Sequence, residues 1–580
     1  MTSPQPGSLL AVDIGSVNTR ALLFDVVDGA YRLVSQGAGR TTIGAPKDDV
    51  FFGILNILRD MEAASSRRLL DANKRLIRPE QADNIGIDYC LTTTSAGHPL
   101  RALLVGLYPQ LDIAGLRRAI APFGMDAVAE IHLQDGLGAH GRLNRLVHSR
   151  PQLIIVAGGT DDGARAPLLE MLSLARQALS LLPLGSRPTV VYAGNSRLTP
   201  SVREMLSQQV EVILAPNIRR ADGALSLDGL RVALAEAFAA HKRRLPAFQQ
   251  LAAMSDSGIL PTARGIETLA AYFSRVERQA ALAVDVGSAR TMVTLARAGK
   301  TTSAVCSDIG LGHSAADTLE RVGEAALITW LPFHPRKGEL AQYALKKGLR
   351  LAHVPLDMRE RYIEYALLRA CLRYALAKLD ESPRPSLLLL AGAALTGGSQ
   401  GALNLLLLAD ALDCAGVMQV KVDAHGALAA LGGLASVAPN AVVQLLDGGI
   451  LQHAGSLIRL AGSAPIGRPA LTMRMKQSNG ETSEREINSG DVWHLPLAQT
   501  ESVELRLQTA RGVHLAGKRR LSMRLAGGRG GLLVDARLDA LEQTTAMTER
   551  ALLLLRWYAA ASGQDHPVAI PESWLAPPED

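Results

Sequence analysis

Two short loops with nearly the same sequence carry the residues best suited to chemistry in this chain. The first reads Asp13-Ile14-Gly15-Ser16-Val17-Asn18-Thr19, and the second reads Asp285-Val286-Gly287-Ser288-Ala289-Arg290-Thr291. Each loop lies between two apolar runs, so each is expected to join two strands. In such a loop a buried strand delivers an Asp to its carboxyl end, and a Gly lets the backbone come close to an anion. Hydroxyl groups and successive backbone N–H groups can then hold phosphate oxygens.

The repetition of this loop is more informative than either copy, because Asp-x-Gly is also an ordinary hairpin turn. Two copies far apart in the chain, each opening a new pair of strands, indicate two homologous halves that face each other across a nucleotide. The alternative is a pair of coincidental turns after buried strands. The two loops resemble the phosphate-1 and phosphate-2 loops of the acetate kinase, sugar kinase, Hsp70 and actin superfamily.

The resemblance to this superfamily implies roles for the loop residues. Asp13 and Asp285 would be the catalytic carboxylates, which orient the attacking water or the metal. Mg²⁺ held largely through waters suits two facing carboxylates, because this ion keeps much of its hydration shell. No general base is assignable, and Asp135 is as easily a turn residue. The phosphate contacts implied by the resemblance are Gly15, Ser16, Thr19, Gly287, Ser288 and Thr291.

A glycine-rich turn in the second half resembles the adenosine segment of the same superfamily. It follows the apolar run 386–390 and reads Ala391-Gly392-Ala393-Ala394-Leu395-Thr396-Gly397-Gly398. A plain turn between a strand and a helix is the alternative. The resemblance implies that Gly392, Gly397 and Gly398 contact the nucleotide, and the expected ligands are therefore ATP and Mg²⁺.

Length and composition set limits on the class of protein. A chain of 580 residues exceeds what one hydrophobic core supports, so two to four domains are expected. The net charge of +6 is mild and its basic residues are scattered, which argues against a nucleic-acid partner. The four cysteines are widely separated, as is typical of a reduced cytosolic protein. No signal peptide or membrane span is expected, so the sequence predicts a soluble cytoplasmic protein.

The order of apolar runs predicts an α/β fold with two similar openings. Strands are expected at 9–13, 21–27 and 31–38, and again at 281–285, 291–297 and 304–308. Between them, runs such as 153–157, 189–193 and 210–214 end in polar turns and alternate with helices, which is typical of a parallel sheet whose ligands bind at the carboxyl ends of the strands. The segment 254–263, with Pro261, is expected to lead out of the first half.

From residue 441 the pattern changes to alternating strands among Gly, Ser and Asn turns, followed by a helix at 545–560. The predicted fold is therefore α/β, with duplicated ribonuclease-H-like (actin-like ATPase) halves around a nucleotide cleft and a C-terminal β-rich unit with a helix. The expected divisions are 1–275, 276–440 and 441–580. The C-terminal unit is either a partner surface or a cap on the second half.

Two central motifs resemble a narrower family. They are Ala157-Gly158-Gly159-Thr160-Asp161-Asp162-Gly163 and Tyr192-Ala193-Gly194-Asn195. Both resemble motifs of the glutamate mutase L family, which is unrelated to the mismatch-repair protein of the same short name. That family has A-G-G-T-D-G-G at the first motif and D-V-G-G-A-T-T-D at the second phosphate loop. Here Asp162 replaces a Gly, Met292 replaces the second acid, and Arg290 lies beside the phosphate position. These three departures are expected to impair ATP hydrolysis more than nucleotide binding.

The resemblance implies a helper or reactivating chaperone-like protein that acts on an adenosylcobalamin-dependent mutase and hydrolyses ATP slowly. It would maintain the mutase or exchange its damaged cofactor. Two other functions stay open. One is an ATP-dependent enzyme of the hydantoinase and oxoprolinase type, and the other is an actin-like scaffold protein that polymerises or recruits partners.

Overall fold

The computed structural model describes residues 6–44, 47–81, 84–163, 165–220, 222–397, 401–478, 480–544, 546–564 and 571–575. The chain divides into two compact units. The first comprises Met1–Gly29 and Val34–Gly265, and the second comprises Ala30–Leu33 and Ile266–Asp580. The sequence-based divisions after residues 275 and 440 stay predictions.

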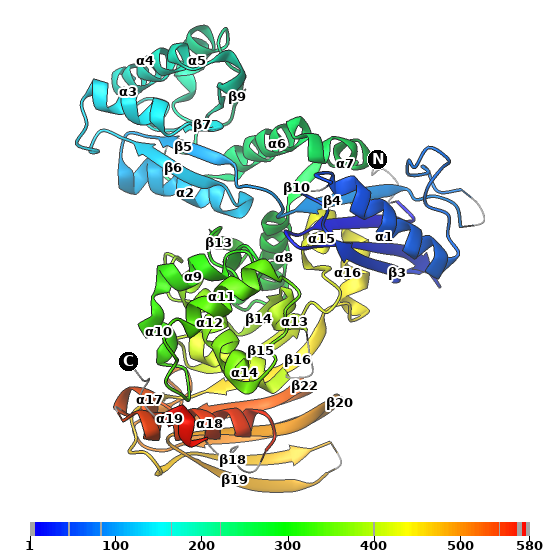
Figure 1. The fold of residues 1–580 in the computed structure, drawn as a ribbon, viewed down its shortest axis with the longest axis vertical. Helices are drawn as coiled ribbons and strands as arrows, with labels where there is room; N and C mark the ends of the chain where they lie inside the picture. The colour runs from blue at the N-terminus through cyan, green and yellow to red at the C-terminus, as the bar shows by residue number, and fades with distance from the viewer. Residues whose placement is uncertain are drawn as a thin grey trace. The chain divides into compact units, whose positions relative to one another are not determined.

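The first unit opens with a mixed five-stranded sheet in the order β10-β4-β1-β2-β3 (Figure 1). Its strands are β1 (Leu9–Ile14), β2 (Asn18–Val27), β3 (Ala30–Arg40), β4 (Tyr89–Thr94) and β10 (Ile259–Pro261). Strand β1 is antiparallel to β2 and parallel to β4, and β4 is parallel to β10. Helix α1 (Val50–Ser65) buries Ile54, Ile57, Leu58 and Met61 in the same core as the β1 side chains. The three expected opening strands are confirmed.

A second five-stranded sheet in the first unit is entirely parallel and has the order β6-β5-β7-β8-β9. Its strands are β5 (Arg101–Val105), β6 (Asp126–Ile131), β7 (Leu153–Val156), β8 (Thr189–Tyr192) and β9 (Val212–Leu214). In chain order this is the 2-1-3-4-5 arrangement of flavodoxin-like folds. The parallel α/β expectation is confirmed for these strands, but their separation into a sheet of their own was not foreseen.

Helices cover both faces of the parallel sheet, because its strands are apolar on both sides (Figure 1). Leu104 and Ile155 belong to the core that contains α2 and α6, whereas Leu103 and Ile154 pack with α3, α4 and α5. Besides α1, the helices described in this unit include α2 (Ala114–Ile120), α3 (Ala139–His148), α4 (Ala166–Leu181), α5 (Thr199–Leu206), α6 (Asp228–Arg244) and α7 (Gln249–Met254).

The second unit contains a ten-stranded sheet in the order β13-β12-β11-β14-β15-β16-β22-β20-β18-β19. Its first five strands repeat the order and directions of the opening sheet, with β11 antiparallel to β12 and parallel to β14. These strands are β11 (Ala281–Val286), β12 (Thr291–Arg297), β13 (Lys300–Cys306), β14 (Leu387–Ala391) and β15 (Gly416–Val422). The expectation of duplicated α/β halves is confirmed by this shared topology.

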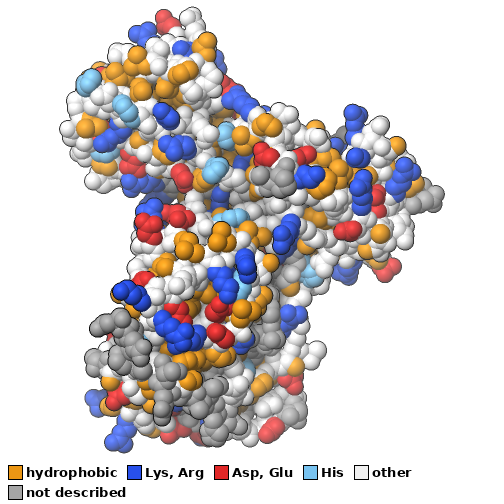
Figure 2. Space-filling view, viewed as in Figure 1, with side chains coloured by type: hydrophobic (Ala, Val, Ile, Leu, Met, Phe, Trp, Pro, Cys, Tyr) orange, Lys and Arg blue, Asp and Glu red, His pale blue; other side chains and the backbone are white. Residues whose placement is uncertain are grey.

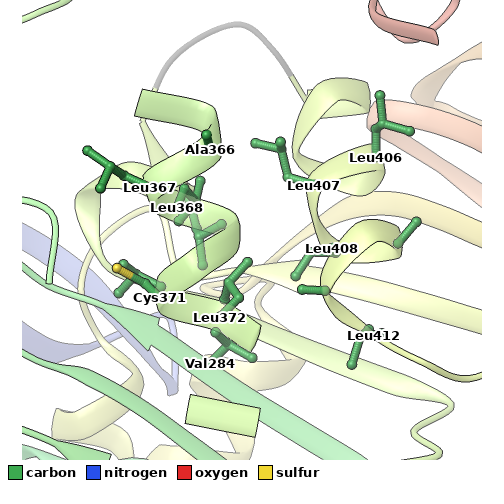
Figure 3. Packing of buried hydrophobic residues seen from close by; sticks show 14 of the residues in the cluster. Val284, Ala366, Leu367, Leu368, Cys371, Leu372, Leu406, Leu407, Leu408 and Leu412 are labelled. Atoms are coloured by element: carbon green, nitrogen blue, oxygen red, sulfur yellow. The ribbon is translucent and has the colours of Figure 1, made fainter. Parts of the chain in front are cut away.

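The core of the second unit is built largely from leucine. Figure 3 shows side chains of α12 (Met358–Leu376) and α14 (Gly401–Ala411) facing one another, near Val284 of β11. Helix α14 is buried around nearly its whole circumference, as its leucine-rich sequence requires. The remaining helices from α8 to α16 are α8 (Thr262–Val276), α9 (Ala315–Val322), α10 (Glu324–Ile328), α11 (Glu339–Leu349), α13 (Ala393–Thr396), α15 (Leu428–Leu434) and α16 (Pro439–Asp447).

The C-terminal strands extend the sheet of the second half, so the expected β-rich unit is not a separate small sheet. Strand β16 is antiparallel to β15 and parallel to β22. The strands are β16 (Gln452–Arg459), β18 (Pro469–Gln477), β19 (Thr482–Asn488), β20 (Asp491–Thr509) and β22 (Arg520–Ala536), with a short pair β17 (Ala461–Gly462) and β21 (Val513–His514). The closing helices are α17 (Ala540–Gln543), α18 (Met547–Ala561) and α19 (Glu572–Leu575).

A buried ion network ties this C-terminal part to the second half. Asp410 of α14 accepts from Arg369 of α12 and from Arg537, which follows β22. Arg537 also pairs with Asp535. Trp557 of α18 donates its Nε1–H to the Gly490 carbonyl over 2.8 Å. Helix α18 and one set of side chains from β16, β20 and β22 pack in the same core as α12 and α14, whereas other side chains of these strands form a second core with β18.

Two further features of the described residues are the character of the helices and the distribution of surface charge. Within the part of the chain that the structure describes, no helix combines the length and apolar character that a membrane crossing needs. On the face drawn in Figure 2, basic side chains lie among acidic ones rather than in a continuous stripe.

Candidate functional site

The two Asp-x-Gly loops have the same backbone construction. The Gly15 N–H donates to the Asn18 carbonyl over 2.9 Å, and the Gly287 N–H donates to the Arg290 carbonyl over the same distance. Each turn closes a hairpin that places an Asp near the carboxyl end of the first strand of its sheet. The loops that resemble each other in sequence are therefore equivalent in structure.

Asp13 is held by two hydroxyl groups from neighbouring strands. Its Oδ1 accepts from Thr93 Oγ1 of β4 over 2.6 Å and from Thr262 Oγ1, directly after β10, over 2.7 Å. Burial raises the pKa of Asp13, while the two hydroxyl hydrogen bonds and the charge of Arg20 oppose that rise. Among the described residues no hydrogen bond reaches Oδ2, so this oxygen is available to a water on a metal ion. Neither threonine stands out in the sequence as a partner of Asp13.

The first loop is clamped from its buried side by Thr41, which follows β3. The Thr41 N–H donates to the Val17 carbonyl over 2.8 Å, and its hydroxyl donates to the Gly15 carbonyl over 2.7 Å. The hydroxyl of Thr19 lies 2.9 Å from that of Thr41, and Thr19 is buried. Thr19 therefore supports the turn from behind, which differs from the direct phosphate contact expected from the sequence. Ser16 is partly exposed at the tip.

The second loop is clamped in the same way by the segment after β13. Ser288 Oγ accepts the His313 N–H over 2.9 Å and lies 3.1 Å from His313 Nδ1, and the Gly312 N–H donates to the Ser288 carbonyl over 2.9 Å. The hydroxyl of Thr291 is buried and donates to the Ile309 carbonyl over 2.9 Å. Thr291, like Thr19, supports its loop from behind. Partial burial lowers the pKa of His313 from its ordinary value of 6.5, which favours the neutral ring.

Gly392 lies directly against the second loop. Its φ is +84°, and a Cβ there would be 2.3 Å from the Val286 carbonyl oxygen and 2.7 Å from Asp285 Oδ1. Only glycine fits such a close approach with this backbone conformation. The Gly397 N–H closes α13 by donating to the Ala393 carbonyl over 2.9 Å. Gly398, the third glycine expected to contact the nucleotide, lies outside the described residues.

Each unit thus assembles part of the expected site. In the first unit Asp13, Gly15 and Ser16 share one loop, and in the second unit Asp285 is brought together with Gly392. Met292, which replaces an acid of the related family, is buried and pairs with Asp285 across the hairpin. Among the described residues no three His, Cys, Asp or Glu side chains form a ready metal cluster.

Comparisons with known proteins give one family and several distant folds. The MutL protein family matches residues 9–450. No curated protein matches the chain. Similar solved structures include the nucleotide-free acetone carboxylase, with 13% identity over 97% of this chain and 86% of that chain and a TM-score of 0.35.

Two further similar structures are smaller proteins. A glycerol dehydratase reactivase has 10% identity, covers 74% of this chain and 99% of its own, and has a TM-score of 0.29. Component A of (R)-2-hydroxyglutaryl-CoA dehydratase from Acidaminococcus fermentans has 7% identity, with 75% and 98% covered and a TM-score of 0.27. At these scores the structures carry no argument, and the assignment rests on the family match.

That match includes both phosphate-type loops and the two motifs at 157–163 and 192–195 that resemble the glutamate mutase L family. It spans well over half of the chain. The chain therefore belongs to the MutL protein family, of the glutamate mutase L type rather than the mismatch-repair type.

Proposed function

We propose that this protein binds Mg–ATP between its two Asp-x-Gly loops and uses slow hydrolysis to act as a reactivating helper of an adenosylcobalamin-dependent mutase. The repeated hairpin is the observation that supports nucleotide binding. Its two strands pair in the same register in both halves, and it lies at the same position in two sheets with the same strand order. A duplicated loop of this kind gives a nucleotide two phosphate-binding turns, one from each half.

The roles of the loop residues follow from their surroundings. Backbone N–H groups and the hydroxyl of Ser16 would bind phosphate oxygens on one side, and the loop at Gly287 and Ser288 would do so on the other. Asp13 and Asp285 would hold Mg²⁺ through its waters. The ion, when bound, neutralises phosphate charge. Asp13 is suited to this because Thr93 and Thr262 fix its Oδ1 and leave its Oδ2 available.

Slow rather than fast hydrolysis is proposed because the second loop lacks an acid where related proteins have one. Met292 at that position is buried and cannot activate a water. Arg290 adds a positive charge beside the phosphate position. Such a site favours a bound nucleotide that persists long enough to switch a conformation, as expected of a helper protein that works by opening and closing.

The mutase-helper role rests on membership of the glutamate mutase L family, and it is tested by association. The purified protein is mixed with an adenosylcobalamin-dependent mutase carrying inactivated cofactor, and complex formation is followed in ATP, ADP and no nucleotide. A complex that depends on the nucleotide, together with recovery of mutase activity in ATP, supports the proposal. Asp13→Asn serves as the matched nucleotide-site control.

Other results with the same purified protein would support one of the two alternative functions, an enzyme or a scaffold. ADP release that depends on a small amide-ring substrate indicates an enzyme of the hydantoinase and oxoprolinase type. Sedimentation of the protein alone in ATP indicates an actin-like scaffold. Mutase activity that recovers equally without nucleotide would contradict the helper role.

A further inference from the structure

The parallel sheet of the first unit has a topological switch point between β5 and β7. The chain leaves β5 toward α2 on one face of the sheet, and it leaves β7 toward α4 on the other face. Strands β5 and β7 are hydrogen-bonded neighbours, so their outgoing loops diverge from adjacent positions. In open α/β sheets ligands bind in the crevice that such a divergence leaves at the carboxyl ends of the strands.

The loop after β7 presents a series of free backbone donors. Among the hydrogen bonds of the described residues, none uses the N–H groups of residues 158–162. Gly158 and Gly159 have φ of +138° and +69°, which turns successive peptide units away from the geometry of a strand. Consecutive unpaired N–H groups in such a turn form a concavity that binds anions.

The loop after β5 is different, because its donors are already occupied. The carboxylate of Asp112 accepts the N–H groups of Leu107 over 2.9 Å and Tyr108 over 3.0 Å. Asp112 is buried, and Arg219 lies 3.6 Å from it and balances its charge. Tyr108, in this loop, is 43% exposed. The loop after β5 therefore contains an exposed aromatic residue, and the loop after β7 contains the unpaired backbone donors.

The acidic side chains of the β7 loop are engaged with neighbouring loops. Asp161 Oδ1 accepts the Ser196 N–H over 2.9 Å and Asn217 Nδ2 over 2.8 Å, and these bonds lower the pKa of Asp161. Asp162 forms an ion pair with Arg197. The loop is thereby held against the loops that follow β8 and β9, so its backbone donors are preorganised rather than free to fold onto the carboxylates.

A second observation at this edge also indicates a missing partner. The Nδ2 of Asn195 is buried and has no acceptor among the described residues. The N–H of Asn195 donates to the Gly158 carbonyl over 3.1 Å, which places this residue beside the β7 loop. A buried donor without an acceptor is rare in native proteins, and a bound group or ordered water usually supplies the missing acceptor.

We propose that this edge is a second ligand site, which takes a phosphate monoester that carries a planar ring. The phosphate binds the N–H groups of residues 158–162, and the ring packs against Tyr108. The site belongs to a different sheet from the Asp13 loop, so it does not depend on the ATP proposal.

The test uses the full chain with flavin mononucleotide as the probe and riboflavin, which has the same ring without phosphate, as its control. Binding is followed by flavin fluorescence, with and without saturating Mg–ATP. Flavin mononucleotide is expected to bind about tenfold more tightly than riboflavin, because only it places a charge on the backbone donors. Equal affinity for the two flavins, or no binding of either, would overturn the proposal.

A matched pair of variants tests the anion-binding loop itself. Asn and Asp both tolerate the left-handed backbone of Gly159, and they have nearly the same shape but differ in charge. Gly159→Asp is expected to bind flavin mononucleotide about tenfold more weakly than Gly159→Asn. Binding of Mg–ATP is expected to be the same in both variants. Equal flavin mononucleotide affinity in the pair would overturn the site.

Asp162→Asn gives an independent readout that leaves the glycines unchanged. It removes one carboxylate from the loop, where the Asp162 side chain is exposed, so folding is expected to be unaffected. Affinity for flavin mononucleotide is expected to rise about threefold, and affinity for riboflavin is expected to stay the same. An unchanged or weaker affinity for flavin mononucleotide would count against the proposal.

Discussion

Gly392→Ala tests the close approach between β14 and the second phosphate loop. The chain offers an unusually well matched control in Gly323. Gly392 has φ +84° and ψ 140°, and Gly323 has φ +78° and ψ 152°, and each precedes a short helix. They differ in surroundings, since a Cβ at Gly323 would have no atom of the described residues within 4 Å.

The expected free-energy costs follow from this comparison. An L-residue in this backbone region costs about 1–3 kcal/mol, and both variants bear that cost. At Gly392 the new Cβ would also lie 2.3 Å from the Val286 carbonyl oxygen, so the loop must move. Such overpacking adds about 1–3 kcal/mol. Gly392→Ala is therefore expected to be the less stable variant by about that difference.

The assay is thermal unfolding of both variants with and without Mg–ATP. Gly323→Ala is expected to keep the full upward shift of the melting temperature on adding Mg–ATP, because its loop is untouched. Gly392→Ala is expected to lose most of that shift, because the displaced loop carries Asp285. Equal unfolding temperatures and equal ATP-induced shifts in the two variants would show that the close approach at Gly392 affects neither stability nor ATP binding.

Four further predictions concern other parts of the molecule. Burial raises the pKa of Asp13 above its ordinary value of 3.8. The stability that the Asp13 carboxyl contributes is therefore complete below pH 3.8 and is lost as the pH rises through the folded-state pKa. Asp13→Asn should raise the melting temperature at about pH 7.5 and abolish the ATP-induced shift of that temperature. Asp410→Ala should destabilise the second unit by about 3–5 kcal/mol in urea unfolding, because Arg369 is left buried without its carboxylate. Truncation before Ala441 should give aggregated protein in size-exclusion chromatography, since β15 loses its neighbour β16; a monodisperse product that binds ATP would contradict this. Burial lowers the pKa of His313, so the contact between His313 and Ser288 is stable above about pH 6.5 and weakens as the pH falls. Calorimetry should find weaker ATP binding by the wild type below about pH 6. The affinity of His313→Gln for ATP should change less over the same pH range.

Much of the fold could be predicted from local sequence patterns. Strands, turns and helices produce recognisable sequence patterns within a few residues, and the repeated loop shows directly that the chain has two similar halves. Which strands share a sheet is a long-range property that these signals do not contain. The strands at 153–157 and 189–193 were therefore predicted correctly, but their separation from the β1 sheet was not foreseen.

The partners of Asp13 show the same limit at the level of the site. Thr93 lies near the end of β4, where the strand residues are threonines that are polar although they are buried, so the apolar pattern does not mark this end of the strand. Thr262 follows Pro261 in a segment expected only to lead out of the first half. That segment is the edge strand β10, where proline is tolerated. Both threonines reach Asp13 through parallel pairing, which leaves no signal in the spacing along the chain.

We propose that one ATP is held by both halves, and isothermal titration calorimetry with Mg–ATP is the direct test. The wild type is compared with Asp13→Asn and Asp285→Asn, one substitution in each loop. We expect one ATP per chain in the wild type and loss of binding in either variant, because each half would supply an indispensable part of a single site. Two ATP per chain, or undiminished binding in either variant, would contradict it.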